Sequence, residues 1–483
     1  MQKASVNVSA WERHNVVDDG SGGLTTRFVF SSLLALGGHC VGAFSIRSPT
    51  TTEVWHYVFT QNTTTGAVTL TVYNEEFVAL FTYPLGAISD TPVITCAVVF
   101  NQMIISSPSF STSLYGLVGG GVMAAVKVAS ENPDTTALDV PVGHCCSFGD
   151  RVAIATGQIV SFSEPRSGDV DIRCFPAVNQ ISLPGAVLDM FQGVDGALYM
   201  FTTAGIYTLP SDALGQGQQV VGYISRIPGL ATMRPRNACP TPFGVAMLDD
   251  TDVVLLNNGT RIPIGTYGGQ RSISRVVDVD DLRIFGELYP TQNGLLLGFR
   301  NTREFYIAID LRTNTASYVY GANTLSLMGV LIDRDGWENH IVSDTFGTNR
   351  ILSQEVTGSL EFDNANLPAY LCGTIEVGPS QRPLFRRASV SYALAGSLIA
   401  GEVERNNDTS TVTTNNVTLI GTSLWSGTGN CSGRSLRSTR LTFNSRSSNP
   451  SLEFQLTGGG FALSSTVQVE SSGLHPSTKD KQQ

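Results

Sequence analysis

Short strand-turn-strand units recur along most of this chain. In each unit, a run of about four to eight β-branched and aromatic residues precedes a tight turn and a second run of the same kind. The clearest pairs are residues 53–60 with 67–73, 197–202 with 206–209, 252–256 with 260–264, and 305–309 with 316–320. The first run of each pair is mostly apolar, which indicates a strand buried on both faces. The chain is therefore predicted to be all-β.

The spacing of these units predicts a particular all-β architecture. They return at irregular intervals of roughly 40 to 55 residues, which is typical of the blades of a β-propeller. We expect a β-propeller of about six to eight blades over residues 25–360, at ~45 residues per blade, preceded by an N-terminal arm at residues 1–24. A pair of two-sheet sandwiches is the alternative architecture. Helix is expected in less than about a fifth of the chain.

The sequence changes in character after Leu360. Long Ser, Thr and Asn tracts alternate with short period-two runs such as Leu452–Leu456. This pattern of alternating residues predicts a C-terminal β-sandwich at residues 361–470. The polar residues 471–483 are predicted to form a disordered tail. Residues 382–446 also hold eight arginines against three carboxylates, a local net charge of +5.

Charged residues are scarce in the chain as a whole, and acidic residues outnumber basic ones. Only 14% of the residues are charged and the formal net charge is −10. This charged fraction is about half of that typical of soluble domains. A neutral surface indicates burial against partner chains, and an acidic balance argues against general affinity for nucleic acid. Of the 30 basic residues only four are lysines, and arginine favours interfacial pairing, although a compositional bias explains the same ratio.

The cysteines and the chain start predict a protein that folds in a cytoplasm. Eight cysteines in 483 residues do not form a disulfide framework. The first residues lack the apolar core of a signal peptide, and no apolar run is long enough for a membrane-spanning helix. We expect the cysteines to be reduced, mostly as small core residues.

No pattern of catalytic or metal-binding residues emerges. His144-Cys145-Cys146 has the wrong spacing for zinc, and Asp278–Asp281 and Asp333–Gly336 are interpreted as Asp-rich turns rather than calcium loops. Gly119–Gly121 lacks the lysine and helix of a phosphate loop. Glycosidase chemistry needs paired carboxylates, for which the loops offer Glu304, Asp310, Asp333 and Asp335. We expect no enzyme activity, no cofactor and no bound metal.

The stretch DRVAIATGQIVSFSEPRSGD at residues 150–169 illustrates the unit. Val152, Ile154 and Thr156 mark a first short run. Ile159, Ser161 and Ser163 mark a second run after the turn Thr156–Gln158, and Glu164-Pro165 ends it. As chemistry, Ser163 and Glu164 would need a partner base that the sequence does not offer. As structure, proline ends a strand because it has no N–H for the ladder and restricts the residue before it. We favour the structural interpretation.

The order of these motifs resembles that of a known family. FNQMIISSP at residues 100–108 precedes the S-E-P stretch, followed by NQISLP at 179–184, GALYMFT at 196–202 and GIYTL at 205–209. Near the end come RRASV at 386–390, GRSLR at 433–437 and SNP at 448–450. This series is similar to tail hub or nozzle proteins of bacteriophages, mostly short-tailed ones. The first 40 residues have no counterpart in it.

The resemblance implies a structural virion protein made in the host cytoplasm. Such a protein is a β-propeller subunit of a homohexameric ring that extends the portal and adaptor, contacts other tail proteins and encloses the DNA exit channel. An acidic wall suits this role because it does not grip phosphates. The alternatives are a phage propeller enzyme that degrades a surface polysaccharide and a propeller that serves as an interaction scaffold.

The C-terminal arginines are the candidate contact residues. Arginine makes bidentate contacts with carboxylates on a neighbouring subunit or with DNA phosphates, and a solvated face without a partner is the third interpretation. The candidates for subunit or DNA contacts are Arg382, Arg386, Arg387, Arg434, Arg437 and Arg440.

Overall fold

The computed structural model covers the chain from end to end, and most of it is described. The described residues are 2–7, 12–18, 23–26, 30–49, 51–129, 136–165, 171–213, 223–227, 234, 236–249, 252–257, 260–264, 273, 277, 279–299, 305–320, 325–336, 338–344, 350–355, 369–376, 383–394, 397–405, 412–420, 437–442, 451–458, 461–464 and 466–473. The single α-helix among them is short, and strands dominate.

Four-stranded antiparallel units follow one another along residues 30–355. The first three are β6 (His39–Arg47), β7 (Val54–Gln61), β8 (Ala67–Tyr73) and β9 (Ala79–Ala87); β10 (Thr95–Val99), β11 (Gln102–Ser106), β12 (Leu114–Leu117) and β13 (Val122–Ala124); and β15 (His144–Phe148), β16 (Arg151–Thr156), β17 (Ile159–Phe162) and β19 (Gln180–Ser182). A separate two-stranded ribbon of β14 (Ala137–Leu138) and β18 (Phe175–Pro176) accompanies the third unit.

The next four units continue the series. They are β20 (Val187–Gln192), β21 (Leu198–Thr202), β22 (Gly205–Leu209) and β23 (Ser225–Ile227); β24 (Ala238–Thr241), β25 (Gly244–Leu248), β26 (Val253–Asn257) and β27 (Thr260–Pro263); β28 (Gly286–Pro290), β29 (Gly294–Phe299), β30 (Phe305–Asp310) and β31 (Thr315–Tyr320); and β32 (Leu325–Ile332), β33 (Glu338–Asp344), β34 (Arg350–Glu355) and β5 (Phe30–Leu36). Six of the units are separate sheets, and β28–β31 belongs to a larger sheet.

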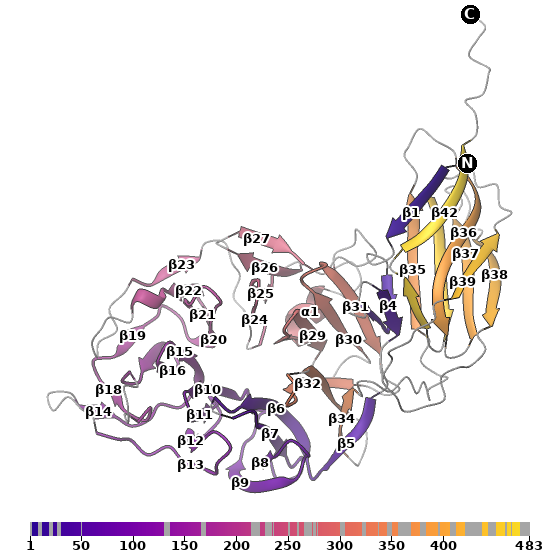
Figure 1. The fold of residues 1–483 in the computed structure, drawn as a ribbon. Coiled ribbons are helices and arrows are strands. Elements are labelled where there is room, and N and C mark those ends of the chain that lie inside the picture. Colours follow the sequence, from indigo (N-terminus) through magenta and orange to yellow (C-terminus); the bar gives the residue numbers. More distant parts are fainter. Residues whose placement is uncertain are drawn as a thin grey trace, which may run out of the picture.

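These units are the blades of a β-propeller (Figure 1). The first strand of each unit contacts the first strand of the next in the series β10, β15, β20, β24, β28, β32, and β32 then contacts β6 of the first unit. The first strands therefore surround the propeller axis. The predicted propeller is confirmed, and the number of four-stranded units lies within the expected range of about six to eight blades.

Strand β5, which lies just before the first unit in the chain, closes the ring. It forms the outer edge of the last unit, where Leu34 and Leu36 lie opposite Leu352 and Arg350 in antiparallel register. Because β5 is followed directly by β6 of the first unit, one short segment joins the two ends of the propeller. Apolar residues of β5 pack on a core that also contains Leu331 and Ile341 of the last unit.

All four hairpins that the sequence predicts most clearly are confirmed. They correspond to β7–β8, β21–β22, β26–β27 and β30–β31. Residues 150–162 form the hairpin β16–β17, and Gly157 in its two-residue turn has a φ of 59°, a value that glycine adopts without strain.

One local prediction is wrong. The expected Asp-rich turn at residues 278–281 instead leads into a helix, α1 (Val279–Phe285), which contains Asp280 and Asp281. Leu282 is buried in a core shared with the neighbouring units, and Phe285 packs against the same core. Burial of one apolar face therefore favours a helix where the sequence alone indicates a turn.

The N-terminal and C-terminal strands pair with each other beside the propeller (Figure 1). One sheet holds β1 (Gln2–Asn7), β3 (Val16–Asp18), β4 (Gly23–Thr26), β36 (Pro383–Leu394), β39 (Arg437–Thr442), β41 (Phe461–Ser464) and β42 (Thr466–Gly473). A second continues from β31 through β2 (Glu12–His14), β35 (Ala369–Glu376), β40 (Ser451–Gly458), β37 (Ser397–Arg405) and β38 (Val412–Ile420). The segment expected to be an arm thus contributes strands, and β42 extends three residues into the expected tail.

Candidate functional site

The structure places four of the six candidate arginines in two paired strands. Arg386 and Arg387 belong to β36, and Arg437 and Arg440 belong to its neighbour β39. In register, Arg440 lies opposite Ser389 and Arg437 opposite Tyr392. Arg382 and Arg434 lie outside the described residues. The fold therefore brings two arginine-containing segments, about 50 residues apart in the chain, onto adjacent strands.

The S-E-P stretch is buried framework. Strand β17 ends at Phe162, one residue earlier than predicted, and Ser163 and Glu164 are no more than 2% exposed. The Ser163 hydroxyl accepts a hydrogen bond from the Val152 amide at 2.9 Å, and the Ser163 carbonyl accepts one from the Arg151 guanidinium at 3.1 Å. The Ser163 hydroxyl thus adds one hydrogen bond beyond the end of the β16–β17 pairing, which is a structural role.

This arrangement predicts that Ser163→Ala destabilises the protein. The change removes the acceptor of the buried Val152 amide, and leaving such a donor unsatisfied costs about 1–3 kcal/mol. Chemical denaturation should show the loss in the free energy of unfolding. Ser182→Ala, at an exposed position of β19, is the control and should change little. Equal stabilities of the two variants would contradict the assigned role.

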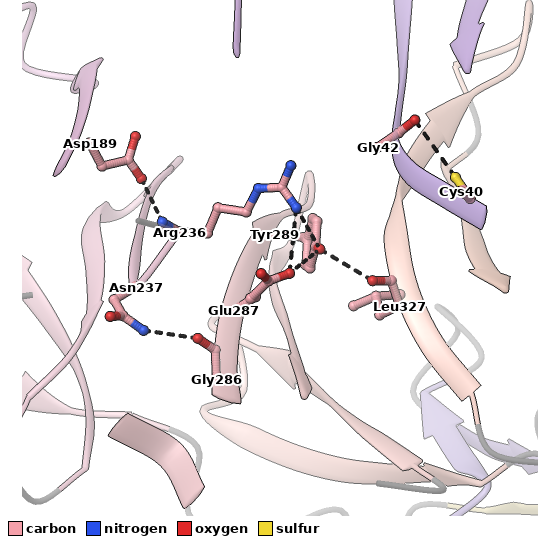
Figure 2. Close-up of polar contacts among 9 residues, drawn as sticks. All are labelled: Cys40, Gly42, Asp189, Arg236, Asn237, Gly286, Glu287, Tyr289 and Leu327. Carbon is pink, nitrogen blue, oxygen red and sulfur yellow. Dashed lines mark hydrogen bonds and ion pairs between the residues drawn. The ribbon is translucent and has the colours of Figure 1, made fainter. Parts of the chain in front are cut away.

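A polar cluster occupies the axis of the propeller (Figure 2). Its central residue is Arg236, which lies two residues before the first strand of the fifth unit. Its partners come from the first strands of other units, namely Asp189 in β20 and Glu287 and Tyr289 in β28. The sequence analysis missed this cluster entirely.

Hydrogen bonds fix Arg236 at both ends. Its backbone N–H donates to Asp189 Oδ2 at 3.0 Å, and its Nη1 lies 3.5 Å from Glu287 Oε2 and 3.5 Å from the Tyr289 hydroxyl. The Tyr289 hydroxyl lies 2.7 Å from Glu287 Oε2 and 3.2 Å from the Leu327 carbonyl of the last unit. Units four to seven are thereby connected through polar groups.

The guanidinium group also reaches the far side of the axis. A β-carbon built on Gly42, in β6 of the first unit, would lie 3.8 Å from Arg236 Nη2. This is an ordinary van der Waals distance, so the guanidinium packs directly against the backbone of β6 at position 42. The Arg236 side chain spans the axis from the fifth unit to the first.

The backbone at Arg236 is held in an uncommon conformation. Arg236 has a φ of 62°, in the left-handed region. The neighbouring Asn237 side chain stabilises this turn, since its Oδ1 accepts a hydrogen bond from the Arg234 amide at 2.7 Å and its Nδ2 donates to the Gly286 carbonyl at 2.8 Å. Strain of this kind is retained where surrounding contacts fix the geometry.

The electrostatics of the cluster follow from burial. Desolvation raises the pKa of Asp189 to about 6, although the Arg236 and Met190 amides and the Arg236 charge oppose the shift. Burial lowers the pKa of His144 to about 4, and the Arg236 charge acts in the same direction. Burial also opposes the charge of Arg236 itself, but Tyr289, Glu287 and Asp189 outweigh it, so its pKa lies above the usual value.

The cluster has the chemistry of a structural lock. One cation is held between a carboxylate and a phenol whose hydroxyl also donates to a backbone carbonyl, while a second carboxylate caps the arginine's own amide. Within the described part of the chain, no three His, Cys, Asp or Glu side chains are arranged to hold a metal ion. We find there no helix long and apolar enough to cross a membrane.

The described carboxylates considered for glycosidase chemistry lie in turns of two neighbouring units, and among the described contacts none pairs them with each other. Asp310 ends β30 and pairs with Arg312 at 2.8 Å in the turn that follows. Asp333 and Asp335 lie in the turn between β32 and β33, and Glu304 lies outside the described residues. The described members thus belong to turns of two different units.

Comparisons with known proteins yield only weak structural similarity. No family model matches the chain, and no curated protein matches it. A solved structure of YCF48 bound to D1 peptide aligns with a TM-score of 0.36 and 12% identity, over 68% of this chain and 98% of that one. The extracellular domain of a hybrid two-component system from B. thetaiotaomicron aligns with a TM-score of 0.39 and 14% identity, over 69% of this chain and 40% of that one.

Proposed function

We propose that this chain is a structural protein of a bacteriophage tail. In this proposal it is a hub or nozzle subunit, assembles as a homohexameric ring below the portal and adaptor, and encloses the channel through which viral DNA leaves. It is made in the host cytoplasm, resides in the virion and has no catalytic role. Residues 361–470 form the β-sandwich that accompanies the propeller.

The observation that carries the proposal is where the tail-protein motifs lie. Between residues 100 and 209 they follow the second, third and fourth units of the propeller in chain order. Ser163, Glu164 and Asn179 within them are buried, as are most residues of β21 and β22. Residues that specify packing support a shared architecture with the tail proteins rather than a shared active site.

The axial cluster also bears on where a DNA channel would run in this proposal. The Arg236 side chain crosses the axis between the fifth and first units, so a duplex has no path through the propeller itself. The proposed role therefore needs a channel between copies of the chain, and this requirement supports a ring of subunits as part of the proposal. The low content of charged residues agrees with extensive burial between subunits.

We expect native mass spectrometry of the purified chain, alone or mixed with portal protein, to show a species of six times 51.6 kDa. Electron microscopy should show rings that attach end-on to portal complexes. The proposal is contradicted by a protein that stays monomeric under both conditions. Turnover of a surface polysaccharide that is lost in Glu304→Gln or Asp335→Asn would instead establish the enzyme alternative.

A further inference from the structure

The two ends of the propeller strands differ in character. In each four-stranded unit, the first-to-second and third-to-fourth connections emerge at one end, because successive strands are antiparallel. We call this end the turn face. Hydrogen bonds join neighbouring units there: the Gln292 amide donates to Glu338 Oε1 at 2.7 Å, and the Gly149 amide donates to Gln192 Oε1 at 3.3 Å.

Exposed apolar side chains gather on the turn face. The connections at this end contain six large hydrophobic residues that are at least 38% exposed, namely Val78, Phe100, Val178, Val194, Tyr223 and Phe243. Among the described residues, the connections at the opposite end contain Val126 and Ile284. These six residues are spread over five units, so they make this end of the propeller more apolar than the other without forming one defined patch.

Carboxylates gather on the same face. Among the described residues, nine that are not buried lie in its connections: Glu53, Glu75, Glu76, Asp150, Asp171, Asp195, Asp212, Asp333 and Asp335. The described residues of these connections include three arginines, Arg173, Arg312 and Arg334, of which the first two pair with Asp171 and Asp310. At the opposite end, the described connections hold four such carboxylates, Asp90, Asp139, Asp249 and Asp281, against Lys127, Arg234 and Arg236.

The acidic groups are densest where the ring closes. Glu53, Glu75 and Glu76 belong to the first unit, and Asp333 and Asp335 belong to the last unit, which is its neighbour. Val78, which is 58% exposed, lies in the same β8–β9 turn as Glu75 and Glu76. This part of the turn face therefore combines an apolar group with carboxylates from two adjacent units.

The complementary charge is present in the same chain. Residues 382–446 have a net charge of +5 within a protein of net charge −10, and paired strands β36 and β39 carry four of their arginines. We propose that the turn face, at its β6–β7, β8–β9 and β32–β33 turns, binds the arginine-containing strands β36 and β39 of a second copy of this chain. Arginine and carboxylate form bidentate, charge-assisted contacts, which give register as well as affinity.

The geometry of such a contact agrees with a ring. The two surfaces are different parts of the chain, so the contact is heterologous, and heterologous contacts generate closed rings or open filaments. This inference rests on the proposed function and names the surfaces that would join its subunits. It assigns the C-terminal arginines to a protein partner rather than to DNA.

Two charge-reversed variants test the proposal. One carries Glu75→Lys and Glu76→Lys, and the other carries Arg386→Glu and Arg387→Glu with a mass tag. Each variant alone places like charges across every subunit contact, so the concentration needed for half assembly should rise about tenfold or more. An equal mixture restores opposite charges at every contact of an alternating ring. Native mass spectrometry should then show oligomers with equal numbers of the two variants.

Asp90→Lys with Asp139→Lys, two exposed changes at the opposite end, is the matched control and should assemble like the wild type. Variants that assemble normally on their own, or a mixture that fails to restore assembly, would overturn the inference while the ring itself stands. Normal assembly with weakened DNA retention in the arginine variant would assign these arginines to DNA. A monomeric wild type would instead remove the proposed function.

Discussion

Replacing Arg236 with methionine should lower the free energy of unfolding by about 3 kcal/mol. Removing one partner of a buried ion pair costs about 3–5 kcal/mol because the other charge stays buried without compensation. We expect the lower end of this range because the Arg236 side chain keeps 18% of its surface exposed, against 11% for Glu287. Chemical denaturation followed by tryptophan fluorescence measures the change.

The comparison with two further variants gives this prediction its specificity. Arg261→Met removes an arginine of the same kind from a pair with Asp249 whose arginine is 36% exposed, and it should cost less than about 1 kcal/mol. Adding Glu287→Gln to Arg236→Met should recover part of the stability, since no uncompensated carboxylate then remains. If Arg236→Met is no more harmful than Arg261→Met, the axial cluster is not a structural lock.

A titration offers an independent readout of the same cluster. The charge of Arg236 contributes, after burial, to the low pKa of His144. In Arg236→Met the pKa of His144 should therefore rise from about 4, while burial keeps it below the ordinary value of 6.5. Nuclear magnetic resonance of the imidazole signals follows this shift. An unchanged His144 pKa would show that the guanidinium does not act on this part of the axis.

Placing two prolines in β5 should unfold the whole propeller at a lower temperature. In Ala35→Pro with Leu36→Pro, which lie in regular register with Ile351 and Arg350, one of two consecutive N–H groups points toward β34, and proline removes that hydrogen bond at a cost of about 1–3 kcal/mol. Because β5 joins the last unit to the first, its detachment also opens the ring and exposes the edge of β34. Exposed edges pair with other chains, so aggregation should accompany the loss.

Strand β9 provides the matched control. It is the outer strand of the first unit, as β5 is of the last, and it already contains Pro84. Phe81→Pro with Thr82→Pro should release β9 locally and leave the main thermal transition close to that of the wild type. Calorimetry distinguishes the two variants. If both shift the main transition equally, closure by β5 has no special role in the stability of the ring.

The sequence predicts those parts of the fold that depend on neighbouring residues. A hairpin such as β7–β8 needs only period-two patterning and the turn residues Asn62–Gly66, and both are visible in the amino-acid sequence. The end of β17 at Phe162 is equally local, because Pro165 and its predecessor determine it. Such features appear in the sequence before any tertiary contact is known.

Features that join distant segments were not predictable in this way. Arg236, Asp189 and Glu287 come from three different units and share no spacing, so no pattern distinguishes them from surface residues. The same holds for α1, where burial of Leu282 against other units outweighs the local preference for a turn. The pairing of β1 with β42 joins the two ends of the chain and has no local signal either.

Closure of the ring by β5 has a consequence for biosynthesis. Strand β5 leaves the ribosome early, but its partner β34 begins only at Arg350, more than 300 residues later. At about 5–20 residues per second, the nascent chain holds β5 without its partner for roughly 15–60 s. Contacts of such high sequence separation also slow folding itself. The hydrogen-bonding edge of β5 therefore has to avoid pairing with wrong strands until nearly the whole propeller has been translated.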